Sequence, residues 1–232
     1  TFNMLHMMNP ANYVEGSFFG FVNNSYAVLG IPARLLGFIV LFFAFGIKIP
    51  IVPLHTWLPD AHVEAPTPVS IILAGVLLKI GGYGIIRICY SIFPDSAAST
   101  NWWIALIGVI SIIYGALNAL AQKDLKRMIA YSSVSHMGFV VLGIASLTAE
   151  GLSGAVFQMI SHGFLSVVLF FLVGVIYERV HDRNIYHFRG LAALMPKYTA
   201  YVAIAFFASL GLPGFSAFIG EAFIIIGVFN AD

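Results

Sequence analysis

The stretch that decides the fold runs from residue 46 to residue 82 and reads GIKIPIVPLHTWLPDAHVEAPTPVSIILAGVLLKIGG. It contains two apolar runs, and each run carries one lysine, Lys48 in the first and Lys79 in the second. Pro50 and Pro53 follow Lys48 closely, and proline removes a backbone donor and breaks a helix. A charge at the centre of a membrane helix costs about 2.5–3.5 kcal/mol, so each lysine must face protein or water. This pattern is typical of a membrane helix interrupted at a functional residue.

The composition of the whole chain agrees with a membrane location. Hydrophobic residues make up 60% of the 232 residues and charged residues only 9%, against about a quarter in soluble domains. The 11 basic residues nearly cancel the 10 acidic ones, which excludes a basic surface for nucleic acid. Cys89 is the only cysteine, so disulfides, iron–sulfur ligation and cysteine-based zinc sites are excluded within this chain. We therefore expect an all-α polytopic transmembrane helix bundle, with any redox cofactor in another chain.

Six segments are long and apolar enough to cross a membrane, which needs about 20 residues. They are residues 32–57, 66–92, 102–122, 127–148, 153–177 and 198–229. Residues 1–31 are interrupted by asparagine, proline and glycine, and we expect an interfacial loop on the outer side, followed by the transmembrane part at 32–232. The chain shows no recognisable signal peptide and starts at Thr1 without an initiator methionine, so we expect a fragment or a split gene product.

The distribution of lysine and arginine predicts the orientation of these spans. Two loops that parity places on one side of the membrane hold most of the positive charge, and positive loops stay on the cytoplasmic side or its equivalent. Their basic residues are Lys123, Lys126, Arg127, Arg179, Arg183, Arg189 and Lys197. Trp102 and Trp103 then fit an aromatic belt at the outer surface.

The first and the last span are both interrupted. The first is broken at KIPIVP and the last at LGLPGFSAFIGE, where Gly211, Pro213 and Gly214 weaken the helix. Five helix steps lead from the first broken span to the last, and five is odd, so the broken spans run in opposite directions. An inverted repeat with one broken helix in each half favours a transport site near the midplane of the membrane. The alternative is that proline and glycine are simply common in membrane helices.

Few ionisable residues lie at membrane depth. Lys48, Lys79 and Glu221 are the charged residues well inside spans, and burial moves the pKa of a lysine and of a carboxyl group toward neutrality. His136 and His162 extend this series, because an imidazole takes a proton on one nitrogen and releases it from the other. Lys48, Lys79, His136 and Glu221 are predicted to form a proton relay, and His162 is a candidate for a further member. The alternative for the two histidines is an interhelical hydrogen bond.

The loop after the first break holds four potential metal ligands: His55, Asp60, His62 and Glu64. Prolines divide them and their spacing matches no compact ligand set. We expect them to cap helix ends rather than to bind a metal, with Thr67 and Pro68 opening the next helix.

Four motifs resemble the antiporter-like subunits of the NADH:quinone oxidoreductase, respiratory complex I. They are KIPIVPLHTWLPDAHVEAPTPVSIILAGVLLKIGGYG (48–84), QKDLKRMIAYSSVSHMGFV (122–140), QMISHGF (158–164) and LPGFSAFIGEAF (212–223). The resemblance extends from about residue 34 onward. It is strongest to the M type, the type of mitochondrial subunit 4, because that type carries a glutamate at the position of Glu221.

The resemblance implies an order for the relay. Lys48 would be the lysine of the first broken helix, Lys79 the central connecting lysine, His136 the histidine leading onward and Glu221 the terminal glutamate. Family members are longer, and the M type pairs the first lysine with a glutamate on an earlier helix. Glu15, in the expected outer loop, does not match that position. A second polypeptide or a missing part of the chain would then supply this carboxylate.

The resemblance also implies a function and its partners. The chain would conduct protons while NADH, FMN, iron–sulfur clusters and quinone act in other subunits of the complex. Its partners would be other membrane-arm subunits and lipids. Its location would be a mitochondrial inner membrane or a bacterial plasma membrane, which the resemblance favours over a thylakoid membrane. The alternatives are a subunit of a multisubunit sodium/proton antiporter or membrane-bound hydrogenase, and a structural membrane subunit that conducts nothing.

Overall fold

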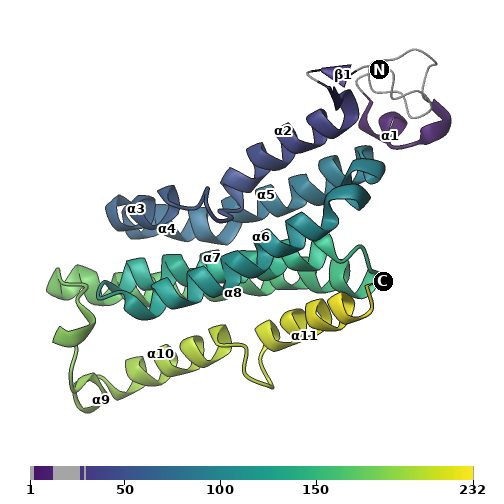
Figure 1. Ribbon diagram of the computed structural model, residues 1–232. Helices are drawn as coiled ribbons and strands as arrows, with labels where there is room; N and C mark the ends of the chain where they lie inside the picture. The colour runs from purple at the N-terminus through teal and green to yellow at the C-terminus, as the bar shows by residue number, and fades with distance from the viewer. Residues whose placement is uncertain (1–2, 13–26, 29, 232) are drawn as a thin grey trace.

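The computed structural model of the chain describes residues 3–12, 27–28 and 30–231, and nearly all of its regular structure is helical (Figure 1). Near the N-terminus lie the short helix α1 (Met4–Met7) and the turn η1 (Pro10–Asn12). Strands β1 (Ala27–Val28) and β2 (Ile31–Pro32) pair antiparallel, a two-residue hairpin that the sequence did not predict. The predicted all-α membrane fold is confirmed. Most of the expected outer loop, including Glu15, lies outside the described residues.

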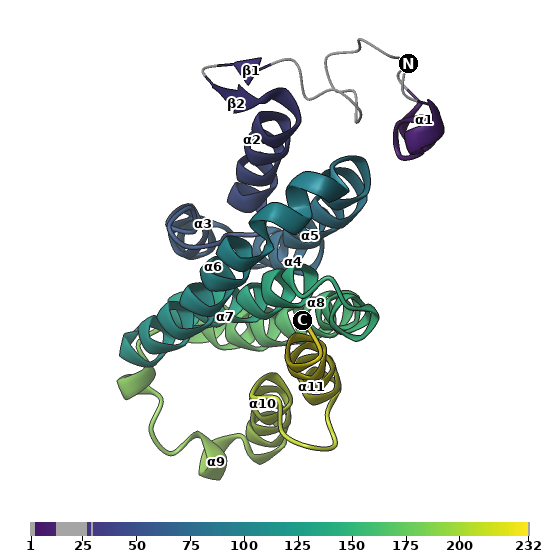
Figure 2. The same ribbon diagram turned by 45° about the vertical axis from the view of Figure 1, so that its right-hand side comes forward.

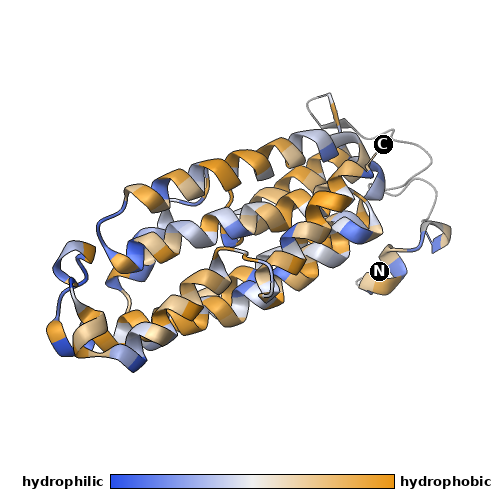
Figure 3. Ribbon diagram, turned by 90° about the horizontal axis from the view of Figure 1, so that it is seen from below, coloured by the Kyte–Doolittle hydropathy of each residue, from blue (hydrophilic) through white to orange (hydrophobic). Residues whose placement is uncertain are grey.

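Within the described residues, four continuous helices are long and apolar enough to cross a membrane. The first covers Thr67–Tyr90 and consists of α4 (Thr67–Ile72), η2 (Leu73–Leu77), α5 (Leu78–Gly84) and η3 (Ile85–Tyr90), where η2 and η3 are wider π-helical segments. The others are α6 (Pro94–Ala121), α7 (Leu125–Ala145) and α8 (Ala149–Val180). Figure 3 shows them apolar along most of their length and hydrophilic toward their ends. They match the four middle spans that the sequence predicts.

The two remaining expected spans are each divided into two shorter helices. The first becomes α2 (Ala33–Lys48) and α3 (Trp57–Glu64), and the last becomes α10 (Pro196–Ser209) and α11 (Ser216–Phe229). Gly211 and Gly214, with φ of +67° and +101°, give the second break a conformation that other residues rarely adopt. Both predicted breaks are therefore confirmed. The expectation of six spans becomes four continuous helices and two interrupted ones.

Glycines allow the helices to approach closely. Helices α6, α7 and α8 form the centre, with α2, α4 and α5 on one side and α10 and α11 on the other (Figures 1 and 2). A Cβ added to Gly138 of α7 would lie 2.8 Å from the backbone nitrogen of Ile112 of α6. A Cβ added to Gly154 of α8 would lie 2.8 Å from the backbone nitrogen of Ile224 of α11. Small residues of this kind are typical of membrane helix interfaces.

Gly81, Gly82 and Gly84 likewise bring helix α5 close to its neighbours. A Cβ on Gly81 would lie 2.7 Å from the nitrogen of Ile49, and one on Gly82 would lie 2.5 Å from the sulfur of Met159. Helix α5 is thus held between the end of α2 and helix α8, which fixes the position of Lys79.

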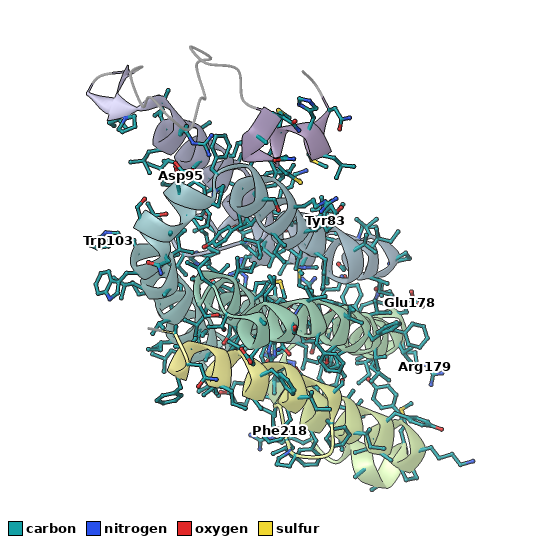
Figure 4. The ribbon with its side chains drawn as sticks, turned by 90° about the vertical axis from the view of Figure 1, so that its right-hand side faces the viewer. Tyr83, Asp95, Trp103, Glu178, Arg179 and Phe218 are labelled. Carbon is teal, nitrogen blue, oxygen red and sulfur yellow. The ribbon has the colours of Figure 1, made fainter. Side chains whose placement is uncertain are left out.

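Two ends of the bundle differ in charge. Trp103 lies at one end, whereas Glu178 and Arg179 lie at the other (Figure 4). At the second end the backbone N–H of Leu125 donates to the carbonyl of Arg183 at 3.0 Å, and Arg183 pairs with Asp124, which caps α7. The loop between α6 and α7 and the connection after α8, which hold most of the basic residues, therefore meet at one end, as the sequence predicts. We call it the inner end. The connection after α8 also contains η4 (Ile185–His187) and α9 (Leu191–Leu194).

Candidate functional site

Lys79 contacts a histidine in the middle of the bundle. Its Nζ lies 2.7 Å from Nδ1 of His162 on α8 and also donates to the carbonyl of Ala74. Nε2 of His162 lies 3.1 Å from the hydroxyl of Ser133 on α7, and that hydroxyl donates to the carbonyl of Ile129. With a lysine donating to Nδ1, the hydrogen of a neutral His162 sits on Nε2. His162 is thus oriented to receive a proton from the side of Lys79 and release one toward α7.

A second cluster joins α7, α8 and α11. Nδ1 of His136 and Nε2 of Gln158 each lie 3.3 Å from Oε1 of Glu221, and the same two nitrogens are 3.3 Å apart. Nε2 of His136 lies 3.4 Å from the hydroxyl of Ser209 at the end of α10. The amide of Gln158 can donate to a deprotonated histidine or to the carboxylate. The cluster therefore accommodates His136 both with and without its extra proton.

A small polar cavity lies between the two clusters. The rings of His136 and His162 have centroids 5.4 Å apart, and each of their four ring nitrogens contacts a group other than the neighbouring imidazole. The cavity has a volume of about 10 Å³, enough for about one water molecule. Its polar lining consists of Ser132, Ser133, His136, Gln158, His162, Ser166 and Ser209. One water there would complete a row from Lys79 to Glu221.

The structure thus brings together four of the five predicted relay residues: Lys79, His162, His136 and Glu221. The sequence ranked His162 as only a possible member, yet its ring contacts Lys79 directly. The signal was present, because Gln158, His162 and Ser166 recur every four residues and all three are buried. Gln158 itself was not predicted as a site residue, although it contacts both His136 and Glu221.

Lys48 does not join this row. It is the last residue of α2 and is exposed, and no hydrogen bond or ion pair of Lys48 occurs among the described residues. Helix α2 packs through Phe38, Phe42 and Gly46, which recur every four residues, and Lys48 lies on a different face. The expected burial of Lys48 is therefore wrong for this chain taken alone.

Three of the four residues after the first break, Asp60, His62 and Glu64, lie on helix α3 and not in the expected loop. Among the described residues no group of three or more histidine, cysteine or acidic side chains is placed to hold a metal. The predicted capping is wrong, because Asp60 binds Arg127 at 2.5 Å and Glu64 is exposed. His55 and His62 are buried, and their ring nitrogens have no hydrogen-bond partner in the part of the chain that the structure describes. Helix α4 does begin at Thr67 with Pro68 in its first turn, as predicted.

The chain is similar to one family along nearly its whole length. The family model described as NADH:quinone oxidoreductase/Mrp antiporter, transmembrane, matches residues 2–232. NADH-quinone oxidoreductase subunit M of Rickettsia conorii is 52% identical over 192 residues, which are 83% of this chain and 39% of the relative. NAD(P)H-quinone oxidoreductase chain 4 1 of a Synechococcus species is 47% identical over 231 residues, 100% of this chain and 44% of the relative. The chain thus spans less than half the length of these relatives.

Solved structures show the same fold. A chain of respiratory complex I from Thermus thermophilus with bound NADH has a TM-score of 0.84 at 33% identity, covering 99% of this chain and 49% of the other. A chain of the Mrp complex from a Dietzia species has a TM-score of 0.82 at 25% identity, covering 98% and 42%. The archaeal membrane-bound sulfane sulfur reductase has a TM-score of 0.80 at 28% identity, covering 86% and 41%.

Proposed function

The chain belongs to the NADH:quinone oxidoreductase/Mrp antiporter transmembrane family, and from that premise we propose that it is part of a proton-translocating membrane subunit of an NADH:quinone oxidoreductase. The observation that carries the proposal is the row of four ionisable residues from Lys79 through His162 and His136 to Glu221. These residues come from four helices far apart in the sequence. A row of ionisable residues inside a membrane bundle costs folding free energy, and residues of this kind typically mark an ion or proton pathway.

Protons pass along the row in steps that the contacts permit. Lys79 gives a proton from Nζ to Nδ1 of His162, and the resulting imidazolium releases a proton from Nε2. The hydroxyl of Ser133 accepts a hydrogen bond there, and a water in the adjoining cavity carries the proton to His136. His136 then shares it with Oε1 of Glu221. Each step transfers only a proton, so no redox chemistry is required of these residues.

Electron transfer takes place in partner subunits in this proposal. NADH, FMN, iron–sulfur clusters and quinone would be bound there, and other membrane-arm subunits and lipids would surround this chain. Redox events would act on the row through charge, because each ionisable pair senses the charge of its neighbour. Lys48 would join the relay together with a carboxylate from another part of the protein or a second polypeptide. The named curated relatives are bacterial, which favours a bacterial plasma membrane.

The alternative functions share the fold. The Mrp complex and the sulfane sulfur reductase align with this chain nearly as well as complex I does, so the fold does not separate them. The 47–52% identity to quinone oxidoreductase subunits favours a membrane subunit of an NADH:quinone oxidoreductase over these alternatives. A structural subunit that conducts nothing is disfavoured by the row itself, because an apolar core would pack without its cost.

The first test identifies the complex. Source membranes are separated on a native gel, stained for NADH oxidation, and the stained band is analysed by intact mass. We expect the full-length chain that contains this sequence in that band. Its absence from the band would favour the antiporter or hydrogenase alternative.

The second test concerns the relay. Vesicles containing the assembled complex are given NADH, and proton uptake into the vesicles is followed with a pH-sensitive dye. Lys79→Ala should abolish most of the uptake in a complex that assembles normally, whereas Glu150→Gln, at the exposed start of α8, should leave it unchanged. Normal uptake with Lys79→Ala would contradict the proposed function and support a structural role.

A further inference from the structure

His62 is a buried histidine that the row from Lys79 to Glu221 does not include. It lies on α3, its exposed fraction is 0%, and neither ring nitrogen has a hydrogen-bond partner among the residues that the structure describes. Its ring stacks on Phe170 of α8, with centroids 4.3 Å apart and planes 16° from parallel. Burying a polar group without a partner is costly, and an apolar side chain would avoid that cost. A buried histidine in this condition is therefore a candidate for a function other than packing.

Cations surround the inner end of α3. Lys126 of α7 donates to the carbonyl of Ala65 at 2.8 Å, and Arg183 donates to the carbonyl of Val63 at 2.7 Å. Arg127 pairs with Asp60 at 2.5 Å. We call these three contacts the inner clamp. Because it joins α3 to the inner ends of α7 and α8, His62 is held directly below the inner surface of the bundle.

An apolar layer separates His62 from the relay. Phe170, on which His62 stacks, belongs to the same buried cluster as Ala74, and the carbonyl of Ala74 accepts a hydrogen bond from Lys79. Lys79 therefore extends its amino group along α4–α5 toward the inner end, where helix α4 begins.

Charge couples His62 to the lysines across the layer. Lys126 lies on the clamp side of His62, where it donates to the carbonyl of Ala65, and Lys79 lies beyond Phe170 and its cluster. The positive charges of these two lysines oppose a third positive charge on His62. When Lys79 passes its proton to His162 and the proton moves on toward Glu221, one of these charges is lost and His62 accepts a proton more readily.

We propose that His62 is the group that reloads Lys79 with protons from the inner side. This inference rests on the proposed function of the row. A proton from the inner surface binds one ring nitrogen of His62, and an imidazolium N–H then breaks as the free amine of Lys79 takes a proton. Phe170 and the apolar side chains of its cluster normally exclude water, which prevents protons from returning from Lys79 to the inner side. Water must enter this layer for the transfer to take place.

The test compares His62→Gln with His55→Gln in the assembled complex. His55 is a matched control because it is also buried with two unpartnered ring nitrogens, but its ring lies against Tyr114 and Tyr131 rather than on the path to Lys79. Assembly is checked by native gel and by NADH oxidation with an artificial electron acceptor. We expect His62→Gln to lower NADH-driven proton uptake by on the order of tenfold or more, and His55→Gln to leave it nearly unchanged.

A pH profile separates proton transfer from a structural role. With His62→Gln, Lys79 must be reloaded from water, so uptake should recover as the pH on the inner side falls. A structural defect would lower uptake equally at all pH values and would overturn the inference. His62→Leu serves as a second variant that fills the space on Phe170, and normal uptake with this variant would overturn the inference as well.

The same measurements distinguish this inference from the proposed function. If Lys79→Ala stops uptake while His62→Gln does not, only the role of His62 is contradicted. If Lys79→Ala leaves uptake normal, the proposed function fails and the inference fails with it.

Discussion

The two interrupted helices carry an ionisable residue beside each break, yet only one of these residues is enclosed by the chain. Glu221 of α11 lies against Gln158 and His136, and a Cβ added to Gly211 in the break would lie 2.5 Å from its Oε2. Lys48 ends α2 and remains exposed. The same sequence pattern thus gives two different environments, because the partner of a residue depends on which helices pack around the break.

The largest expected effect comes from the enclosed break. Glu221→Gln keeps the size of the side chain but removes the charge that His136 faces at 3.3 Å. We expect NADH-driven proton uptake by vesicles to fall by on the order of tenfold or more, the range of a positioned proton-transfer group. The control is Glu178→Gln at the inner end of α8, which should change uptake little. Unchanged uptake with Glu221→Gln in an assembled complex would remove Glu221 from the relay.

The glycines of the second break allow a finer comparison. Gly211 and Gly214 both have positive φ, so alanine at either position is strained by about 1–2 kcal/mol. Only at Gly211 would the added Cβ meet the carboxylate of Glu221, because nothing lies within 4 Å at Gly214. Gly211→Ala should therefore lower proton uptake several-fold, and Gly214→Ala should lower only the thermal stability of the complex. Equal uptake by the two variants would show that the contact with Glu221 has no role.

The difference between the two breaks can also be measured as coupling. His136 and Glu221 are in contact, so a double-mutant cycle of His136→Ala and Glu221→Ala should give a coupling free energy of about 1 kcal/mol in thermal stability. The cycle of Lys48→Ala with Glu221→Ala should be additive within about 0.5 kcal/mol, because Lys48 has no described contact with that cluster. A large coupling in the second cycle would contradict the separation of the two sites.

Much of the fold follows from the sequence because the physical signals are strong. A run of about 20 apolar residues has few alternatives to a membrane helix, and a proline or glycine in such a run marks a break. The position of Lys79, His136 and Glu221 deep in the membrane was predictable as well, because each lies well inside such an apolar run. Most helix ends agree with the predictions to within a few residues, but α6 begins at Pro94 rather than at residue 102 and the first broken span continues through α3 to Glu64 rather than ending at residue 57.

The partners of each residue did not follow from the sequence. The contact between Lys79 and His162 requires α5 to pack on α8 at one height, and that height is set by glycine contacts such as Gly82 with Met159. The pairing of Asp60 with Arg127 depends on the approach of α3 to α7, and so does the burial of His62. Residue type and spacing identify a side chain that needs a partner, but long-range packing selects the partner.

The smallest expected effect concerns the inner clamp, which holds the inner half of the first broken helix. The side chains of Arg127 and Asp60 are 44% and 71% exposed, and an exposed ion pair contributes only about 0.2–1 kcal/mol. Arg127→Ala should therefore lower the midpoint of thermal unfolding only slightly. Lys126→Ala should lower it more, because Lys126 is 2% exposed and its loss leaves the partly buried carbonyl of Ala65 without its donor. Thermal unfolding of both variants in detergent measures the difference. If Arg127→Ala lowered the midpoint of thermal unfolding more than Lys126→Ala, the inner clamp would depend mainly on its exposed ion pair. Helix α3 would then be held by surface contacts and not enclosed by the bundle as α11 is.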